Sequence, residues 1–557
     1  MKPISKKDRY SATLLAIVML LLSSCKGNDV NKQSSYLQLE GPVELTVPEG
    51  GITQEYTVKS NGPWEVIRKS AQTWAETRPA SGAGDGTFRM IVGENKSGSD
   101  RTMRFTFLLD GEEQERDIMI VQSGSMLVWD EINQDQNLIF IRHGIPAYDA
   151  TNYLYRRDGQ PLFNIKMQEP SIVAVATKPE PWGYFQFPCF YRRASDGLIL
   201  LTWKYSEDDV AYATPAFPEN YRISSDRGKT WNTTNSPPWE SMAHVMGNGE
   251  GISVRTPPAI KISESDLILP ECIGTTRDSY TREYSFYRLE ELPPVVQGVY
   301  LNRWNLNDGS HTRIHARLED PRAVRHAEGD YFPVWWWGDM KLLPDNSLIT
   351  GIYSMFYELE TGGVDDPSGI SFYRSTDHGN NWRIRGKIPY KYDASVDPNG
   401  SRRTGFGYIE PTFEVLSDGN FVCVVRTHDG FGHSPQYISW SSNQGITWTD
   451  PVPFTPNGVN PRLLLLDNGV LVLASGRPGI QLRFSFDGKG EEWTDPFEML
   501  SWDNIARERA GVSCGYASLL PTGTNSFLIA YSDFMFLNEN NEFRKAIKIR
   551  EITVNKE

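Results

Sequence analysis

The feature that most constrains this chain is an eight-residue pattern, Ser-x-Asp-x-Gly-x-x-Trp, that recurs from residue 224 onward. It occupies Ser224–Trp231 and Ser375–Trp382, recurs with Asn for Asp at Ser441–Trp448, and returns with one extra residue at Ser485–Trp493. In a tight turn the Asp side chain accepts hydrogen bonds from backbone N–H groups, and Gly adopts a left-handed conformation. A Trp at the end of such a turn can fill space between packed layers. Four copies predict an architecture that reuses one hairpin turn.

A second repeat runs from about residue 126 to the end, where an apolar run, a polar turn and another apolar run follow one another. We find it in six segments: 190–202, 259–269, 340–352, 413–425, 463–474 and 517–531. Asp-Gly or Asn-Gly between alternating hydrophobic residues is a strong hairpin signal. The turns lie about 50 to 80 residues apart, which suits one four-stranded propeller blade with its loops. The six segments predict six blades.

Composition supports a chain built of strands. Aromatic residues make up 12% of the 557 residues, and 47 Gly and 35 Pro supply frequent turn formers. No long segment keeps an apolar period of 3.6 residues, the signature of an amphipathic helix. The length exceeds one ordinary domain. We therefore expect an all-β fold, an N-terminal immunoglobulin-like β-sandwich followed by a six-bladed β-propeller.

The first 25 residues have the pattern of an export signal. Basic residues precede a short apolar run, Leu14–Leu22, which is too short for a membrane-spanning helix. The following Leu22–Cys25 resembles the lipobox of bacterial lipoproteins, which implies diacylation of Cys25 and anchoring to the bacterial outer membrane, at its periplasmic face or the cell surface. Residues 26–35 would form a tether. A cleaved signal with an incidental Cys is the alternative.

Residues 36–124 contain five short alternating runs that predict strands at 43–47, 56–58, 88–92, 103–107 and 117–121. This number of strands suits an immunoglobulin-like sandwich. The stretch resembles the BACON domain of Bacteroidetes carbohydrate-active proteins, on the strength of Asn61–Trp64, Trp74, Pro79–Gly82 and Val121–Gly124. The resemblance implies either glycan binding or a spacer role, and both remain open. We expect Trp64 and Trp74 in the core.

Charge and cysteines exclude several classes of function. A net charge of −14 argues against a nucleic-acid partner. Four cysteines besides Cys25 are far apart in strand-like runs and lack the spacing of a zinc site: Cys189, Cys272, Cys423 and Cys514. We expect buried free thiols, with a disulfide left open. We expect no metal, no cofactor and a monomer.

The four turn motifs resemble the Asp boxes of sialidases, and this resemblance covers about residues 126–557. It implies an active site on the propeller axis, where three arginines bind the substrate carboxylate, a Tyr is the nucleophile, a Glu is its base and an Asp is the acid/base. The anomeric carbon of sialic acid bears a carboxylate, which would repel an anionic nucleophile but not a neutral phenol. Asp boxes lie away from this site and carry no chemistry.

Four residues match the family's motifs in the family's order. Glu410, followed by Pro411, corresponds to the base, and Arg426 at the end of the next strand corresponds to one carboxylate-binding arginine. Arg477, just before the last turn motif, corresponds to another arginine, and Tyr516 corresponds to the nucleophile. Arginine suits this role because its planar fork binds a carboxylate at two points.

The acid/base and the first arginine match less well. Asp208 and Asp209, after the first hairpin, are candidates for the acid/base, and loop charges without a catalytic role are the alternative. The family's first arginine is replaced by Gln186, and the Glu that supports it is replaced by Ser532. These two changes suggest a remodelled subsite. Arg142, in a stretch that ends Ile145-Pro146, is a candidate substitute.

The resemblance therefore implies an exo-acting, retaining glycoside hydrolase that releases a terminal sialic acid or a related acidic sugar from glycans. Two alternatives stay open: a glycan-binding lipoprotein without catalysis, and a propeller glycosidase or lyase that uses other residues, such as His428 and His433. Trp335–Trp337 could form a sugar-stacking wall or the core of a blade.

Overall fold

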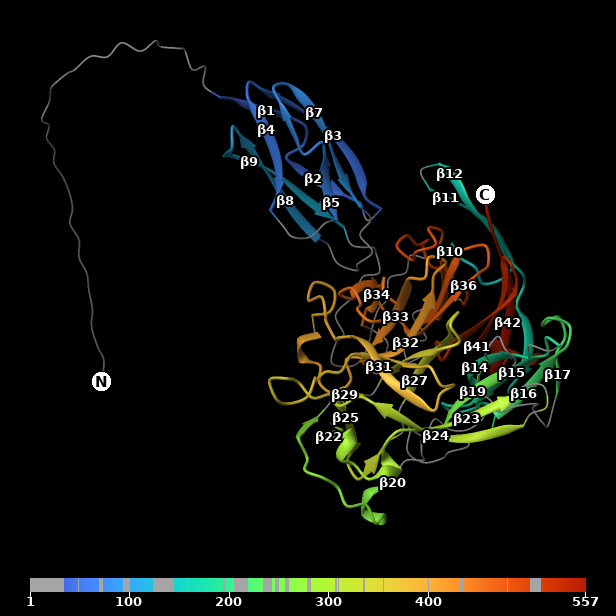
Figure 1. The fold of residues 1–557 in the computed structure, drawn as a ribbon. Helices are drawn as coiled ribbons and strands as arrows, with labels where there is room; N and C mark the ends of the chain where they lie inside the picture. Colours follow the sequence, from blue (N-terminus) through green and yellow to red (C-terminus); the bar gives the residue numbers. More distant parts are fainter. Residues whose placement is uncertain are drawn as a thin grey trace, which may run out of the picture. The chain divides into compact units, whose positions relative to one another are not determined.

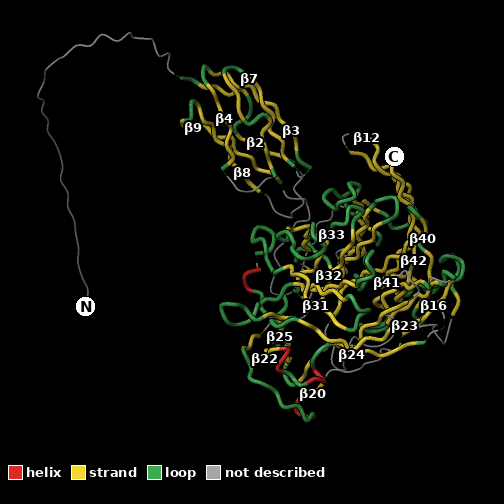
Figure 2. The backbone as a smooth tube through the Cα atoms, viewed as in Figure 1, coloured by secondary structure: helices red, strands yellow, loops and turns green. Residues whose placement is uncertain are grey.

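The structure is a computed structural model. It describes residues 35–557 except 49, 70–73, 94–100, 124–144, 158, 194–195, 205–218, 234–242, 246–249, 256–259, 278–281, 306–307, 309, 334–335, 354, 399, 430–433, 478 and 501–511. Within these residues the fold is all-β, and helical structure is limited to four short 3-10 turns (Figure 2). None of the described helices is long and apolar enough to cross a membrane. Cys25 and the export signal lie outside the described residues.

The N-terminal unit is a sandwich of two sheets, drawn in blue in Figure 1. One sheet has the order β1 (Leu37–Glu40), β3 (Ile52–Ser60), β7 (Gly86–Val92), β5 (Ala75–Arg78). The other has the order β2 (Glu44–Val47), β9 (Glu112–Gln122), β8 (Arg101–Leu109), β4 (Pro63–Arg68), β6 (Ser81–Ala83). All five expected strands are present. Trp64 is 3% exposed and its indole N–H donates to the Gly84 carbonyl at 2.9 Å, which confirms it as a core residue, whereas Trp74 is half-buried.

The C-terminal unit is a propeller (Figure 1). The strand pairing among the described residues defines six four-stranded blades. Blade 1 consists of β14 (Gln186–Arg192), β15 (Ile199–Lys204), β16 (Glu219–Ser224) and β17 (Asn232–Thr233). Blade 2 consists of β18 (Ala243–Val245), β19 (Glu250–Arg255), β23 (Val299–Asn305) and β24 (His311–Glu319). Blade 3 consists of β27 (Trp336–Leu342), β28 (Leu348–Tyr353), β30 (Ile370–Ser375) and β31 (Asn381–Ile388).

The remaining blades follow the same plan. Blade 4 consists of β32 (Tyr408–Val415), β33 (Phe421–Thr427), β34 (Gln436–Ser441) and β35 (Val452–Thr455). Blade 5 consists of β36 (Val459–Leu465), β37 (Leu471–Gly476), β38 (Ile480–Ser485) and β39 (Phe497–Glu498). Blade 6 consists of β40 (Ala517–Gly523), β41 (Ser526–Leu537), β42 (Phe543–Lys556) and, from the start of the propeller, β12 (Gln160–Met167).

The first strands of the blades lie side by side around the ring, in the order β18, β14, β40, β36, β32, β27. Blades 2 and 3 are joined by the parallel pairing of β24 with β31. The two ends of the propeller are joined because β12 and β13 (Ser171–Val175) both pair with the C-terminal strand β42. This arrangement puts residues from distant parts of the chain at one centre.

One predicted hairpin is wrong. Within 259–269, Ile260–Lys261 forms β20 and Ile262–Glu264 forms a 3-10 turn closed by a hydrogen bond from the Ser265 N–H to the Ile262 carbonyl. β20 pairs with β26 (Tyr331–Phe332) instead of folding back on itself. These strands belong to an additional sheet that also contains β21 (Gly274–Arg277), β22 (Glu283–Arg288), β25 (Ala323–Glu328) and β29 (Phe356–Tyr357). The hairpin of blade 2 is β18–β19, whose connection contains Asn248-Gly249, the stronger dipeptide signal.

Each repeated turn follows the third strand of a blade, as the copy at Ser375–Trp382 illustrates. The Ser375 hydroxyl accepts a bond from the Gly379 N–H at 2.8 Å, and the Asp377 carboxylate accepts one from the Asn381 N–H at 2.9 Å. Gly379 has φ +89°, a left-handed conformation. The Trp382 indole N–H donates to the Gly379 carbonyl at 3.0 Å, and its ring lies in the apolar core that blades 2 and 3 share. The predicted roles of Asp, Gly and Trp are confirmed in this turn.

We expect Trp382→Ala to destabilise the propeller by about 3–5 kcal/mol, because it removes a side chain with 0% exposure from a core between two blades. Trp448, the equivalent residue of the third turn, is half-buried, so Trp448→Ala should cost clearly less. Urea unfolding followed by near-UV circular dichroism measures both. Equal losses from the two substitutions would contradict the assignment of Trp382 to that core.

The four described cysteines are free thiols. Cys423 and Cys514 are buried, Cys189 is half-buried and Cys272 is exposed. The prediction of buried thiols is therefore wrong for Cys272, which lies in a loop before β21 and not in a strand.

Candidate active site

The first strands of four blades share one irregularity. Their pairing with the second strand shifts by one or more residues between Gln186 and Cys189, Trp337 and Met340, Ile409 and Thr412, and Val459 and Arg462. A bulge of this kind redirects a side chain that regular alternation would place elsewhere. In three of the bulges, the residue before a proline has a left-handed backbone: Phe187 (φ 53°), Glu410 (φ 51°) and Asn460 (φ 41°). Strained non-glycine residues of this type concentrate at functional sites.

Glu410 is the centre of a hydrogen-bonded group drawn from three blades. Its Oε1 accepts bonds from the Tyr516 hydroxyl and from the Arg426 guanidinium, the latter at 2.9 Å. Its Oε2 accepts a bond from the Asn460 backbone N–H at 2.7 Å. Tyr516 directly precedes β40, Arg426 lies near the end of β33 and Asn460 lies in β36. A phenol, a carboxylate and a guanidinium thus meet at the ring of first strands.

The surroundings of Glu410 keep it ionised. Burial raises the pKa of the carboxyl, but the Arg426 guanidinium and the hydrogen bonds from Tyr516 and the Asn460 N–H outweigh burial and lower it below its usual value. The Arg426–Glu410 ion pair is itself buried, with side-chain exposures of 6% and 10%. A carboxylate in this state can accept a proton from a neighbouring group.

The Tyr516 phenol is neutral at physiological pH. Burial raises its pKa and the adjacent Glu410 carboxylate raises it further, while Arg426 and Arg477 act in the opposite direction. Its ring packs edge-on against Phe187 with centroids 4.7 Å apart. The hydroxyl can therefore lose its proton only as it reacts, and the ionised Glu410 is in contact to receive it.

Arg477 lies directly after β37, and its side chain contacts two neighbouring groups. Its Nε donates to the Cys514 carbonyl at 3.2 Å, and its guanidinium lies 5.6 Å from the centre of the Trp182 ring. Its charge lowers the pKa of Tyr516, as that of Arg426 does. The two arginines from the sequence analysis therefore both act electrostatically on the phenol.

Gln186 is fully buried, and neither its Oε1 nor its Nε2 has a hydrogen-bond partner among the described residues. Lys204 lies opposite it in the register of β14 and β15. The Lys204 ammonium is 5.8 Å from the centre of the Phe187 ring, which in turn contacts Tyr516. The hydroxyl of Ser532 lies 3.0 Å from the Cys514 thiol. Gln186 and Ser532 are both neutral, and Lys204 brings a positive charge to this part of the site.

Several candidate residues lie outside the described residues: Asp208, Asp209, Arg142, Cys25, His433 and Trp335. The structure therefore leaves their roles as predictions. His428 is described and half-buried, and its carbonyl accepts a bond from Arg403.

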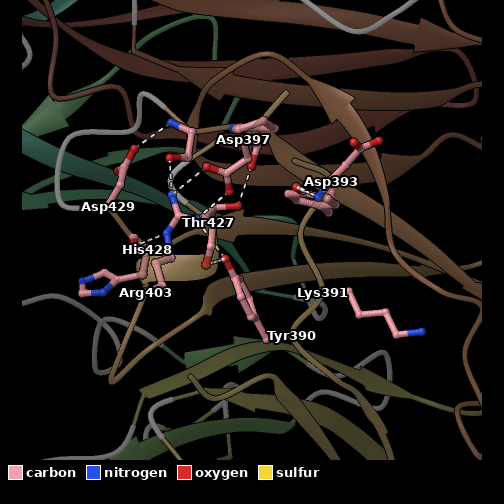
Figure 3. Close-up of polar contacts among 12 residues, drawn as sticks. Tyr390, Lys391, Asp393, Asp397, Arg403, Thr427, His428 and Asp429 are labelled. Atoms are coloured by element: carbon pink, nitrogen blue, oxygen red, sulfur yellow. Dashed lines mark hydrogen bonds and ion pairs between the residues drawn. The ribbon is translucent and has the colours of Figure 1, made fainter. Parts of the chain in front are cut away.

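Arg403 joins the loop before β32 to the segment after Arg426 (Figure 3). It donates to the Asp397 carboxylate at 3.2 Å through Nη2, to the Tyr390 hydroxyl at 2.9 Å and to the Ser434 hydroxyl at 2.6 Å. Its bond to the carbonyl of His428, two residues after Arg426, is 3.2 Å long. Asp397 is buried, and the side chain of Arg403 is 10% exposed. The bonds of Arg403 to His428 and Ser434 hold the chain that leaves the strand carrying Arg426, and the ion pair with Asp397 fixes Arg403 itself.

Sequence reasoning missed three polar residues at the site: Asp339, Tyr353 and Arg462. Arg462 Nη1 donates to Asp339 Oδ1 at 3.0 Å, a contact between blades 5 and 3. Glu410 and Tyr516 both raise the pKa of Tyr353, at the end of β28, after burial as the main cause. The X-Pro dipeptides at 187–188, 410–411 and 460–461 are the signal that points to this region, since each marks a bulge.

In the part of the chain that the structure describes, no group of three or more His, Cys, Asp or Glu side chains is arranged to hold a metal ion. The polar groups at the site instead form ion pairs and hydrogen bonds with one another. Their arrangement suits proton transfer and the binding of a polar ligand.

No family model matches the sequence, and no curated protein is significantly similar to it. Among solved structures, the chain is similar to a protein of unknown function from Dyadobacter fermentans (14% identity, TM-score 0.42, 69% of this chain and 99% of that one). It is also similar to the Trypanosoma rangeli sialidase (13%, TM-score 0.34, 73% and 58%) and to the Ruminococcus gnavus intramolecular trans-sialidase (13%, TM-score 0.36, 69% and 96%). Similarity at this level carries no information on activity.

Proposed function

We propose that this chain is an exo-acting, retaining glycoside hydrolase that releases a terminal sialic acid or a related acidic sugar from glycans. One observation carries the proposal: the neutral Tyr516 phenol donates a hydrogen bond to an ionised Glu410 carboxylate that is paired with Arg426. Covalent catalysis generally uses a nucleophile that contacts its base, while a third group orients the base. Here these parts would be Tyr516, Glu410 and Arg426.

In the first step, the Tyr516 oxygen attacks the anomeric carbon while its proton passes to Glu410. The bond from that carbon to the leaving oxygen breaks, and Asp208 or Asp209 gives that oxygen a proton. In the second step, water attacks the same carbon, its proton returns to the Asp, and the bond to Tyr516 breaks. Glu410 then returns the proton to the phenol oxygen. Each displacement inverts the carbon, so the configuration is retained overall.

The proposed substrate is acidic because two guanidinium groups lie near the nucleophile. Arg426 and Arg477 would bind the carboxylate of the sugar, and both already influence the Tyr516 phenol. Gln186 would contribute a neutral amide where the sialidase family has a third arginine. A carboxylate held by two arginines is bound less tightly than one held by three, which leaves room for related acidic sugars.

The rest of the chain would present this site to glycans outside the cytoplasm. We propose residues 1–25 as a lipoprotein signal with Cys25 as the lipidated residue, and 26–35 as a tether. Residues 36–124 would be a BACON-like sandwich and 126–557 the sialidase-like propeller. The protein would be a monomer anchored to the outer membrane. Arg142 would be a further arginine for the substrate carboxylate, and Asp208 or Asp209 would be the acid/base.

Sugar release from α-linked 4-methylumbelliferyl glycosides of N-acetylneuraminic acid, of the related deaminated acid and of glucuronic acid tests this function. We expect hydrolysis of at least one of the first two, with the α-anomer of the sugar appearing first in proton NMR. Hydrolysis of glucuronide alone would reject a sialic-type substrate. Binding of sialylated glycans without release would favour the alternative, a glycan-capturing protein.

A further inference from the structure

Two polar side chains beside Glu410 take no part in the mechanism above. Arg462 lies on β36, the first strand of blade 5, and Tyr353 is the last residue of β28 in blade 3. The pKa of Arg462 is raised: burial is the largest single cause and lowers it, but nearby negative groups, Asp339 first and Glu410 among them, together outweigh burial. β28, which ends at Tyr353, packs against β32, the strand that carries Glu410. Glu410 and Tyr516 raise the pKa of Tyr353, and Arg462 lowers it. Both side chains therefore lie within electrostatic reach of the Tyr516–Glu410 pair.

Arg462 is held in place yet open to solvent. Its Nε donates to Asn460 Oδ1 at 3.0 Å and its Nη1 donates to Asp339 Oδ1 at 3.0 Å. Asp339 is itself fixed by the hydroxyl of Thr412. The side chain of Arg462 is 34% exposed, whereas that of Arg426 is 6% exposed. A guanidinium has five N–H donors, so two fixed bonds leave donors for a ligand.

The charge of Arg462 is balanced by neighbouring carboxylates. Asp339 contacts it directly and Glu410 lies nearby, so a second carboxylate would meet two negative charges as well as the cation. A sugar hydroxyl brings no charge and needs both a donor and an acceptor. Tyr353 is half-buried, and its hydroxyl makes no hydrogen bond among the described residues. A phenol can donate and accept, so it complements the donors of Arg462.

Building on the proposed function, we propose that Arg462 and Tyr353 form a subsite that binds a hydroxyl group of the sugar ring beside Glu410, and that Arg462 is a specificity-determining residue. The substrate class is then an acidic sugar with a free hydroxyl at the position that meets this pair. A sugar that lacks this hydroxyl leaves the polar pair without its ligand. A sugar that carries an ester there cannot donate to Tyr353.

Calorimetric binding of N-acetylneuraminic acid and its monodeoxy analogues to the full chain tests the subsite without any need for turnover. We expect Arg462→Met to weaken binding of the parent sugar about 10- to 100-fold, the range for a hydrogen bond to a charged group. Tyr353→Phe removes one oxygen and should weaken binding about 3- to 10-fold without affecting the fold. One monodeoxy analogue should bind wild type and Arg462→Met alike, because it lacks the group that Arg462 binds.

Arg383→Met is the matched control, since Arg383 lies on β31 and its side chain is 75% exposed. It should bind every sugar as wild type does. If Arg462→Met and Tyr353→Phe bind the whole series as wild type does, or if no sugar of the series binds wild type, the subsite is refuted. Failure of the proposed function would give a different result. The sugars would bind, and both variants would bind them more weakly than wild type, but wild type would release no sugar from any glycoside.

Discussion

Tyr516→Phe should lower kcat/KM for a cleavable sialoside by about 10³-fold or more, which corresponds to about 4 kcal/mol of lost transition-state stabilisation. The substitution removes only the oxygen that would attack the anomeric carbon. Phe keeps the ring that packs against Phe187. Glu410 keeps its bonds to Arg426 and to the Asn460 N–H, so the site should remain folded. Steady-state kinetics with a fluorogenic sialoside measure the loss.

Tyr531→Phe is the matched control in the same blade. The Tyr531 hydroxyl is fully buried and has no hydrogen-bond partner among the described residues, so its removal should leave kcat/KM unchanged. An activated fluorosugar should add one sugar mass to wild type at the peptide that contains Tyr516, and should add none to Tyr516→Phe. A Tyr516→Phe protein that keeps a tenth of the wild-type activity would contradict the role of this phenol.

The repeated turns were predictable because each one is local. Ser375, Asp377, Gly379 and Trp382 make their contacts within eight residues, so the spacing of the side chains carries the whole geometry. The failed hairpin at 259–269 shows the limit of local patterns. Its apolar residues fit a hairpin equally well, but β20 pairs with Tyr331–Phe332, about 70 residues later, which no local signal reveals.

The polar contacts of the site depend on long-range pairing. The Glu410–Tyr516 contact joins residues 106 positions apart, and it could be expected only because both residues matched a family's motifs. The Arg462–Asp339 contact spans 123 positions and matches no motif, so it was missed. The bulge before Pro411 gives Glu410 a left-handed backbone, which a regular strand would not provide. An X-Pro dipeptide near the start of a first strand therefore marks a bulge in three of these blades.

The ion pair between Arg426 and Glu410 has a consequence for stability that depends on pH. Glu410 has a folded-state pKa below its ordinary value because Arg426, Tyr516 and the Asn460 N–H together outweigh its burial. A carboxyl of this kind stabilises the fold above its unfolded pKa of about 4.3, and the contribution is lost as the pH falls through the folded pKa. Without Arg426, burial dominates and the folded pKa rises above the ordinary value. The carboxylate then destabilises the fold above about pH 4.3.

Arg426→Met should therefore destabilise the propeller by about 3 kcal/mol at pH 7, the lower end of the cost of leaving a buried charge without its partner, since Glu410 retains two hydrogen bonds. At pH 4 the loss of unfolding free energy should be much smaller, because Glu410 can take up a proton and become neutral. Urea unfolding at both pH values measures the difference. Arg550→Met is the control, because Arg550 is buried but donates to the carbonyls of Gln168 and Ala147, which do not titrate. Arg550→Met should lower the free energy of unfolding by a similar amount at both pH values. If Arg426→Met also lowers it equally at pH 4 and pH 7, Glu410 does not depend on Arg426 for its charge.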